Sequence, residues 1–151
     1  MNYYGDLIAV VGTLGDPRSI DALIGAVETG GDATEPLAAF GSEAIPALLA
    51  RMRDGDMLAR FACLEVLVAM LEPLNRSLVT PSGFAAIASA VRSEGHDENA
   101  QVRAVAIRGL GALSKRSDCG AVRAAAADPA VVVRQAAVAA SQQLNCDAPI
   151  H

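Results

Sequence analysis

The sequence contains very few aromatic residues: tryptophan is absent, and Phe, Trp and Tyr together make up 3% of the 151 residues. Proteins that bind flipped or single-stranded bases stack them on aromatic rings, and strands of β-sandwiches are rich in aromatic and β-branched residues. The three phenylalanines, Phe40, Phe61 and Phe84, occupy positions within apolar patterns. The shortage of aromatic residues therefore argues against a base-stacking surface and against an all-β fold.

Positive charge and long apolar runs are also scarce. The chain has 12 Lys and Arg against 17 Asp and Glu, which gives a net charge of −5. Recognition of a phosphate backbone needs a basic stripe, so we predict no nucleic-acid partner. The most apolar stretch, residues 61–71, is interrupted by Glu65 and is far shorter than the roughly 18 residues that a membrane-spanning helix needs. We therefore predict no membrane partner.

Cysteine is limited to three residues, and no CxxC pair occurs. Cys63 lies in an apolar stretch, where cysteine usually acts as a small hydrophobic residue. Cys119 follows Lys115, Arg116 and Asp118, so nearby cations could lower the pKa of its thiol, although a small residue filling a helix start is the favoured interpretation. The first residues lack the basic region of a secretory signal. These features predict a reduced, cytoplasmic protein.

No catalytic motif is present: the sequence has no HExxH, P-loop, GxSxG or dinucleotide-binding fingerprint. The segment most similar to a metal site is SEGHDEN at 93–99, which contains Glu94, His96, Asp97 and Glu98. We interpret it as a polar loop whose carboxylates favour the start of the next helix. The sequence thus predicts no catalytic residue, no metal and no cofactor, and it favours a protein that is not an enzyme.

The residues that are abundant predict helices. Apolar residues make up 52% of the chain, and alanine, the best helix former, is frequent among them. Apolar positions recur at i, i+3, i+4 and i+7, as one face of a helix requires. Three such sets begin at Ile20, Ile45 and Phe84. The predicted helices cover residues 3–13, 17–28, 33–40, 42–53, 56–72, 81–93, 98–113, 117–126 and 129–144.

Several helix starts carry capping signals. An oxygen-bearing residue precedes a proline at Asp16, Thr80 and Asp128, the order expected of an N-cap followed by the first helical position. Asp32 with Glu35 resembles a capping box, and Ser42 is a further candidate cap. Short connections favour antiparallel neighbours, and repeated helix pairs favour a stacked solenoid over a closed bundle.

Two groups of repeated segments carry a family resemblance. LGDPRSIDALI at 14–24 and FGSEAIPALL at 40–49 open second helices, whereas DMLAR at 56–60, NAQVR at 99–103 and DPAVVVRQAAVAA at 128–140 open first helices. In these segments the chain resembles the HEAT-repeat family, particularly its short bacterial HEAT-like form. It departs from that family in its irregular repeat spacing, in an insertion at LEPLNRSLVT and in a last helix without a following partner.

The resemblance implies one domain over residues 1–151, an all-α, right-handed solenoid of about four to five antiparallel helix pairs. Family members are mostly protein-binding scaffolds, with minorities that attach bilins or act as DNA glycosylases. We therefore expect a non-enzymatic scaffold module that recognises a protein partner through its concave face. The alternative is a HEAT-like enzyme or enzyme subunit, such as a bilin lyase component.

Positions outside the core of the second helices are the candidate partner-binding residues: Asp21, Glu28, Arg51, Arg53, Ser89, Arg92 and Arg123. Arg51 and Arg53 are the favoured anchors, because arginine binds carboxylates in a bidentate manner and is enriched at binding hot spots. The loop at 73–80 is a second candidate contact. A homo-oligomer formed through the C-terminal helix, residues 129–144, is a further prediction.

Overall fold

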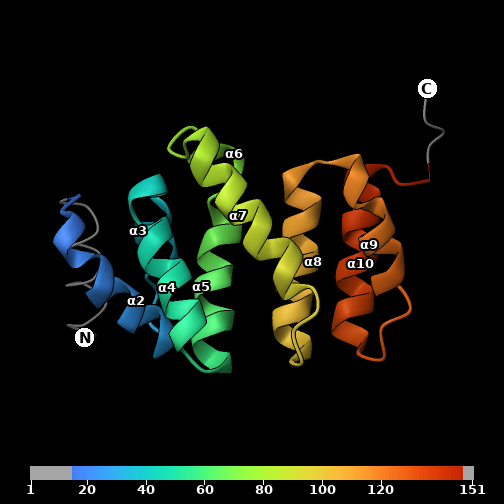
Figure 1. Cartoon of the computed structure of the whole chain (residues 1–151), viewed down its shortest axis with the longest axis horizontal. Helices are drawn as coiled ribbons and strands as arrows, with labels where there is room; N and C mark the ends of the chain where they lie inside the picture. The colour runs from blue at the N-terminus through green and yellow to red at the C-terminus, as the bar shows by residue number, and fades with distance from the viewer. Residues whose placement is uncertain (1–14, 148–151) are drawn as a thin grey trace. The chain divides into compact units, whose positions relative to one another are not determined.

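A computed structural model describes residues 15–147 of the chain, and in this range every regular element is a helix (Figure 1). The predicted all-α fold class is thereby confirmed for the described residues. The chain divides between Ile87 and Ala88 into two compact units, unit 1 and unit 2, and each is described by itself. The helix predicted at 3–13 lies outside the described residues. No described helix is both long enough and apolar enough to cross a membrane.

Unit 1 contains most of the predicted helices of the first half of the chain. In order, they are α2 (Ile20–Glu28), α3 (Thr34–Ala38), α4 (Ile45–Asp54), α5 (Met57–Ala69) and α6 (Pro73–Arg76), with single 3-10 turns at Pro17–Ser19 and Gly41–Glu43. Helix α7 (Pro81–Glu94) begins in unit 1 and ends in unit 2. Only α6 falls outside the predicted helices, since it lies in the segment that the sequence presents as an insertion.

Helix α5 has few polar residues and is the central helix of unit 1. It contacts α2, α3 and α4, and its Leu64, Val66 and Leu67 are completely buried. Cys63 is buried on the same helix. Burial, and to a smaller extent the negative charge of Glu28, raises the pKa of the Cys63 thiol to about 11, so this thiol is neutral and unreactive near pH 7.

The inserted segment, residues 71–80, is held on unit 1 by hydrogen bonds to Ser42. The amide of Ser42 donates to the carbonyl oxygen of Leu78 at 3.2 Å, and the amide of Thr80 donates to Oγ of Ser42 at 2.7 Å. Gly41 has φ +59°, and a Cβ there would lie 2.2 Å from the Leu78 carbonyl oxygen. A side chain at position 41 therefore cannot be accommodated without moving the loop.

Side chains fix the other end of the same segment. Asn75 is buried, and its Nδ2 donates to the carbonyl oxygen of Ala69 at 3.0 Å. The guanidinium of Arg76 lies over the ring of Phe84, 5.3 Å from its centroid. Leu74, which directly precedes Asn75, is 91% exposed. A well-anchored loop thus presents a leucine to solvent.

Unit 2 is organised around α8 (Ala100–Leu113), which contacts α10 (Val131–Leu144) along most of its length and also contacts α9 (Cys119–Ala125). A single 3-10 turn at Arg116–Asp118 precedes α9. The close approach of α8 to α10 depends on Gly111, because a Cβ there would lie 3.1 Å from Cα of Ala140. Val102, Leu110, Val133 and Leu144 are buried between these helices.

Two of the predicted N-caps are confirmed. Asp16 accepts a hydrogen bond from the amide of Arg18 at 3.0 Å and opens the first 3-10 turn. Oγ1 of Thr80 accepts from the amide of Gly83 at 3.1 Å, within the first turn of α7.

Three other cap predictions are wrong. Helix α3 begins after Ala33 without a side-chain cap, so Asp32 and Glu35 form no capping box. Ser42 lies inside a 3-10 turn and binds the inserted segment instead, while α4 begins after Ala44. Asp128 precedes the first residue of α10 by three positions, because its carboxylate is used in a contact with α8.

Candidate functional site

Arg103, in the first turn of α8, joins two loops of unit 2. Its Nε and Nη2 donate to the two carboxylate oxygens of Asp128 at 3.0 and 2.9 Å. Its Nη1 donates to the carbonyl oxygens of Asp97 and Glu98, both at 3.0 Å. The Arg103 side chain is only 17% exposed. All three nitrogens of this guanidinium are therefore engaged within the protein, which gives Arg103 a structural role.

The loop before α10 repeats the local structure of the loop before α8. Nη1 of Arg134 donates to the carbonyl oxygens of Asp128 and Pro129, as Nη1 of Arg103 does to the loop before α8. Asp97 and Asp128 each accept a hydrogen bond from the amide two residues further on. The segments 99–103 and 128–140, which were compared on sequence, thus open their helices in the same way.

The pair with Arg103 changes the protonation of Asp128. The hydrogen bond from the guanidinium, followed by the one from the Ala130 amide, holds the pKa of Asp128 below the 3.8 of an ordinary aspartate. As the pH falls, the Asp128 carboxyl therefore binds a proton at a higher pH in the unfolded chain than in the folded one. The stabilisation from the pair is therefore complete above about pH 4 and is lost as the pH falls through the lower folded pKa.

This linkage predicts how replacing Arg103 alters acid stability. Arg103→Gln should lower the melting temperature at neutral pH and should also flatten its decline between about pH 5 and pH 2, because the lowered pKa of Asp128 is lost. Thermal melting across this range, followed by circular dichroism, measures both effects. Lys115→Gln, which removes a positive charge at an exposed residue shortly after the same helix, is the matched control. Parallel pH profiles for Arg103→Gln and the parent protein would contradict the prediction.

A second arginine–aspartate pair lies between the end of α7 and the turn before α9. Nε and Nη2 of Arg92 donate to the two carboxylate oxygens of Asp118 at 2.9 and 3.0 Å. The side chain of Arg92 is 46% exposed, whereas that of Asp118 is 9% exposed. Arg92 is therefore held in a fixed orientation at the surface, where part of its guanidinium remains accessible.

The two ion pairs border one groove of about 580 Å³, lined only by residues of unit 2. Its apolar lining comes from Ile107 and Leu110 of α8 and Val133 of α10. The exposed Ala121 and Ala124 of α9 contribute small side chains that leave the groove open. The remaining lining residues are Gly95, His96, Asp97 and Ala125. Because Ile107, Leu110 and Val133 are at most 3% exposed, they form the floor of the groove, and the exposed alanines of α9 supply apolar surface that a partner can reach. The groove thus combines small apolar side chains with a charged border.

Of the candidate partner-binding residues in unit 1, Arg51 and Glu28 form an ion pair with each other. Nε of Arg51 donates to Oε1 of Glu28 at 2.6 Å, so this favoured anchor already binds a carboxylate of its own chain. The hydrogen bond to Glu28 is also the main reason why the pKa of Arg51 is raised. Asp21 and Arg53 are exposed. A partner-binding role for these four residues stays a prediction.

The candidate partner-binding residues in unit 2 lie in surroundings that differ from one another. Arg92 lines the groove, and Ser89 is exposed on α7. Arg123 is outside the groove lining, and its Nη2 donates to the carbonyl oxygen of Cys146. Arg103, Asp118 and Asp128 also line the groove, and they were not among the residues predicted from the sequence. The separation of 25 to 26 residues between each arginine and its aspartate is a signal that could have identified them.

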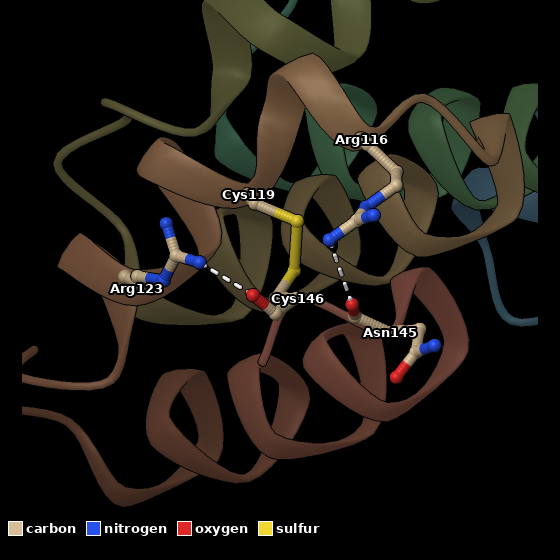
Figure 2. Close-up of a disulfide and its surroundings, with 5 residues drawn as sticks. All are labelled: Arg116, Cys119, Arg123, Asn145 and Cys146. Atoms are coloured by element: carbon tan, nitrogen blue, oxygen red, sulfur yellow. Dashed lines mark hydrogen bonds between the residues drawn. A yellow bond between two sulfur atoms is a disulfide. The ribbon is translucent and has the colours of Figure 1, made fainter. Parts of the chain in front are cut away.

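A disulfide joins Cys119, the first residue of α9, to Cys146, which follows α10 (Figure 2). Arg123 donates to the carbonyl oxygen of Cys146, and Nη2 of Arg116 donates to that of Asn145 at 3.2 Å. The prediction of reduced cysteines is therefore wrong for two of the three, and Cys119 is neither a reactive thiol nor merely a space-filling residue. The prediction failed because the partner lies 27 residues away, beyond the range of local patterns.

His96 and Asp97 of the segment 93–99 line the groove. Among residues 15–147, no group of three or more His, Cys, Asp or Glu side chains is arranged to hold a metal ion. In the structure Asp97 and Glu98 instead accept hydrogen bonds that shape the start of α8. Comparison with protein-family models and with curated proteins gives no match for this chain.

Proposed function

We propose that the chain is a non-enzymatic protein-binding module, and that the groove of unit 2 receives a segment of a partner protein. The observation that carries this proposal is the combination of an apolar lining from Ile107, Leu110 and Val133 with two fixed ion pairs at the border. Binding sites in proteins commonly have this composition, since apolar contact supplies affinity and a few polar groups fix orientation.

The two ion pairs have different roles in this proposal. Arg103 uses all three nitrogens within the chain and keeps the loops on either side of the groove in place. Arg92 is more exposed and is already oriented by Asp118, so a partner carboxylate can bind it at little cost in side-chain entropy. The small side chains of α9 allow the partner backbone to approach closely.

A HEAT-like solenoid remains our proposed architecture for the whole chain, and the concave face of such an array is the proposed location of the binding surface. The equivalent starts of α8 and α10 support a repeat of helix pairs. A cytoplasmic location was the prediction from the sequence. The Cys119–Cys146 bond favours an oxidising compartment instead, because structural disulfides are rare in the reducing cytoplasm.

Site-specific photocrosslinking tests the proposed groove. A photoreactive amino acid placed at Ala124, which is exposed and lines the groove, should form protein adducts when the chain is incubated with an extract of its native cells. The same amino acid at Gln142, exposed on α10 and outside the groove lining, is the control position. Mass spectrometry of the adducts identifies the segment that is bound.

A second variant connects the adducts to the groove itself. Ala121→Trp places a large ring in the groove from an exposed position, so it should remove the adducts formed from position 124 and leave the fold intact. Adducts that are equally abundant from positions 124 and 142, or that persist in Ala121→Trp, would contradict the proposal.

A further inference from the structure

From the α6 loop, residues 72–80, and the groove of unit 2, we infer that this chain recognises a second copy of itself: Leu74 of one copy enters the groove of another. The inference rests on the proposed function of the groove as a protein-binding site. It identifies the bound segment as one that the chain itself carries.

The α6 loop presents its leucines in an ordered conformation. Leu74 is 91% exposed and Leu78 is 48% exposed, although the hydrogen bonds of Ser42 and Asn75 and the stacking of Arg76 on Phe84 hold the loop. An exposed apolar side chain on an ordered loop loses little conformational entropy on binding. This preorganisation distinguishes Leu74 from a leucine exposed on a mobile segment.

The groove offers matching apolar contacts. Ile107, Leu110 and Val133 line a space of about 580 Å³, and the alanines of α9 leave its opening unobstructed. A leucine that moves from 91% exposure into such a groove exchanges part of its contact with water for contact with apolar side chains. Removal of apolar area from water is the main favourable term in protein association.

Arg92 offers the α6 loop a charge of opposite sign at the groove border, beside its own partner Asp118. Glu72 is exposed and precedes Leu74 by two residues. Within residues 15–147, the pair with Asp118 occupies Nε and Nη2 of Arg92, which leaves Nη1 for the carboxylate of Glu72 from the second copy. The apolar contact thus favours association, and this charge pair selects the orientation of the entering loop.

The test is self-association of the full chain, measured by sedimentation equilibrium from about 5 to about 500 µM, the range expected for a contact smaller than a standard interface. The parent protein should show a mass that rises with concentration. Leu74→Asp and Ala121→Trp should each weaken association about tenfold to hundredfold, as expected for the loss of one buried leucine. Both positions are exposed, so the melting temperatures should equal that of the parent.

Mixing the two variants makes the test specific. Leu74→Asp keeps an intact groove and Ala121→Trp keeps an intact α6 loop, so an equimolar mixture should recover association but stop at pairs. Leu58→Asp, which changes a leucine that is 50% exposed on α5, is the matched control and should associate as the parent does.

Three results would overturn the inference: a parent protein that stays monomeric over the whole range, association that survives both variants, or variants that fail to complement each other. Photocrosslinking from position 124 separates this failure from failure of the proposed function. A monomeric chain whose groove crosslinks to a different protein would reject self-recognition and keep the groove as a binding site. Absence of any groove-specific adduct would reject both.

Discussion

Replacing Cys119 by serine should lower the free energy of unfolding by about 3–4 kcal/mol, the value expected when a crosslink between residues 27 positions apart is removed from the unfolded chain. Urea denaturation followed by circular dichroism measures the change. Cys146→Ser should give the same value, and the double variant should add nothing to either single change.

Reduction of the parent protein provides an independent control for this expectation. A dithiol reductant should bring its unfolding midpoint to that of Cys119→Ser, while it should leave the variant unchanged. Thiol titration should detect no reactive thiol in the native parent protein, since Cys63 is buried with a raised pKa, and one after unfolding. Identical stability with and without reductant would contradict the assigned disulfide.

Leu48→Asp should unfold unit 1. Leu48 is completely buried on α4, which packs against the central helix α5. An unpaired carboxylate at this position costs several kcal/mol, a large part of the roughly 5–15 kcal/mol that stabilises an ordinary domain. Circular dichroism of the purified variant should show a clear loss of helix at about 25 °C.

The matched control for this change is Leu58→Asp, which makes the same substitution at a leucine that is 50% exposed on α5. It should change stability by no more than about 0.5 kcal/mol, as is usual for surface positions. A Leu48→Asp variant that melts at the temperature of the parent would show that the helix register derived for residues 45–52 is incorrect.

The sequence predicted the core of the helices well, because burial of one helical face imposes a local period of 3.6 residues. Ile20, Leu23 and Ile24 are buried as the first apolar set requires, and so are Ile45 and Leu48 of the second. The boundaries of the long helices were also close to those observed. These properties depend on residues that lie within one or two turns of each other.

The candidate site could not be predicted in the same way, because it depends on contacts between distant loops. Arg103 reaches Asp128 across 25 residues, and Cys119 reaches Cys146 across 27. Ser42 carries the composition of a helix cap, yet it binds Thr80, 38 residues away. In each case the local pattern is compatible with a simpler role, and only the packing of the chain reveals the partner.

The disulfide also determines how unit 2 responds to mechanical force. When the chain is pulled from its two ends, the covalent path crosses directly from Cys119 to Cys146. The 27 residue steps between the sulfurs are then withheld from extension, which shortens the stretched chain by about 90 Å, given roughly 3.3–3.6 Å per extended residue. Helices α9 and α10 therefore bear no direct tension while the bond is intact. Only after a reductant has broken the disulfide can the chain between the two cysteines be extended by force.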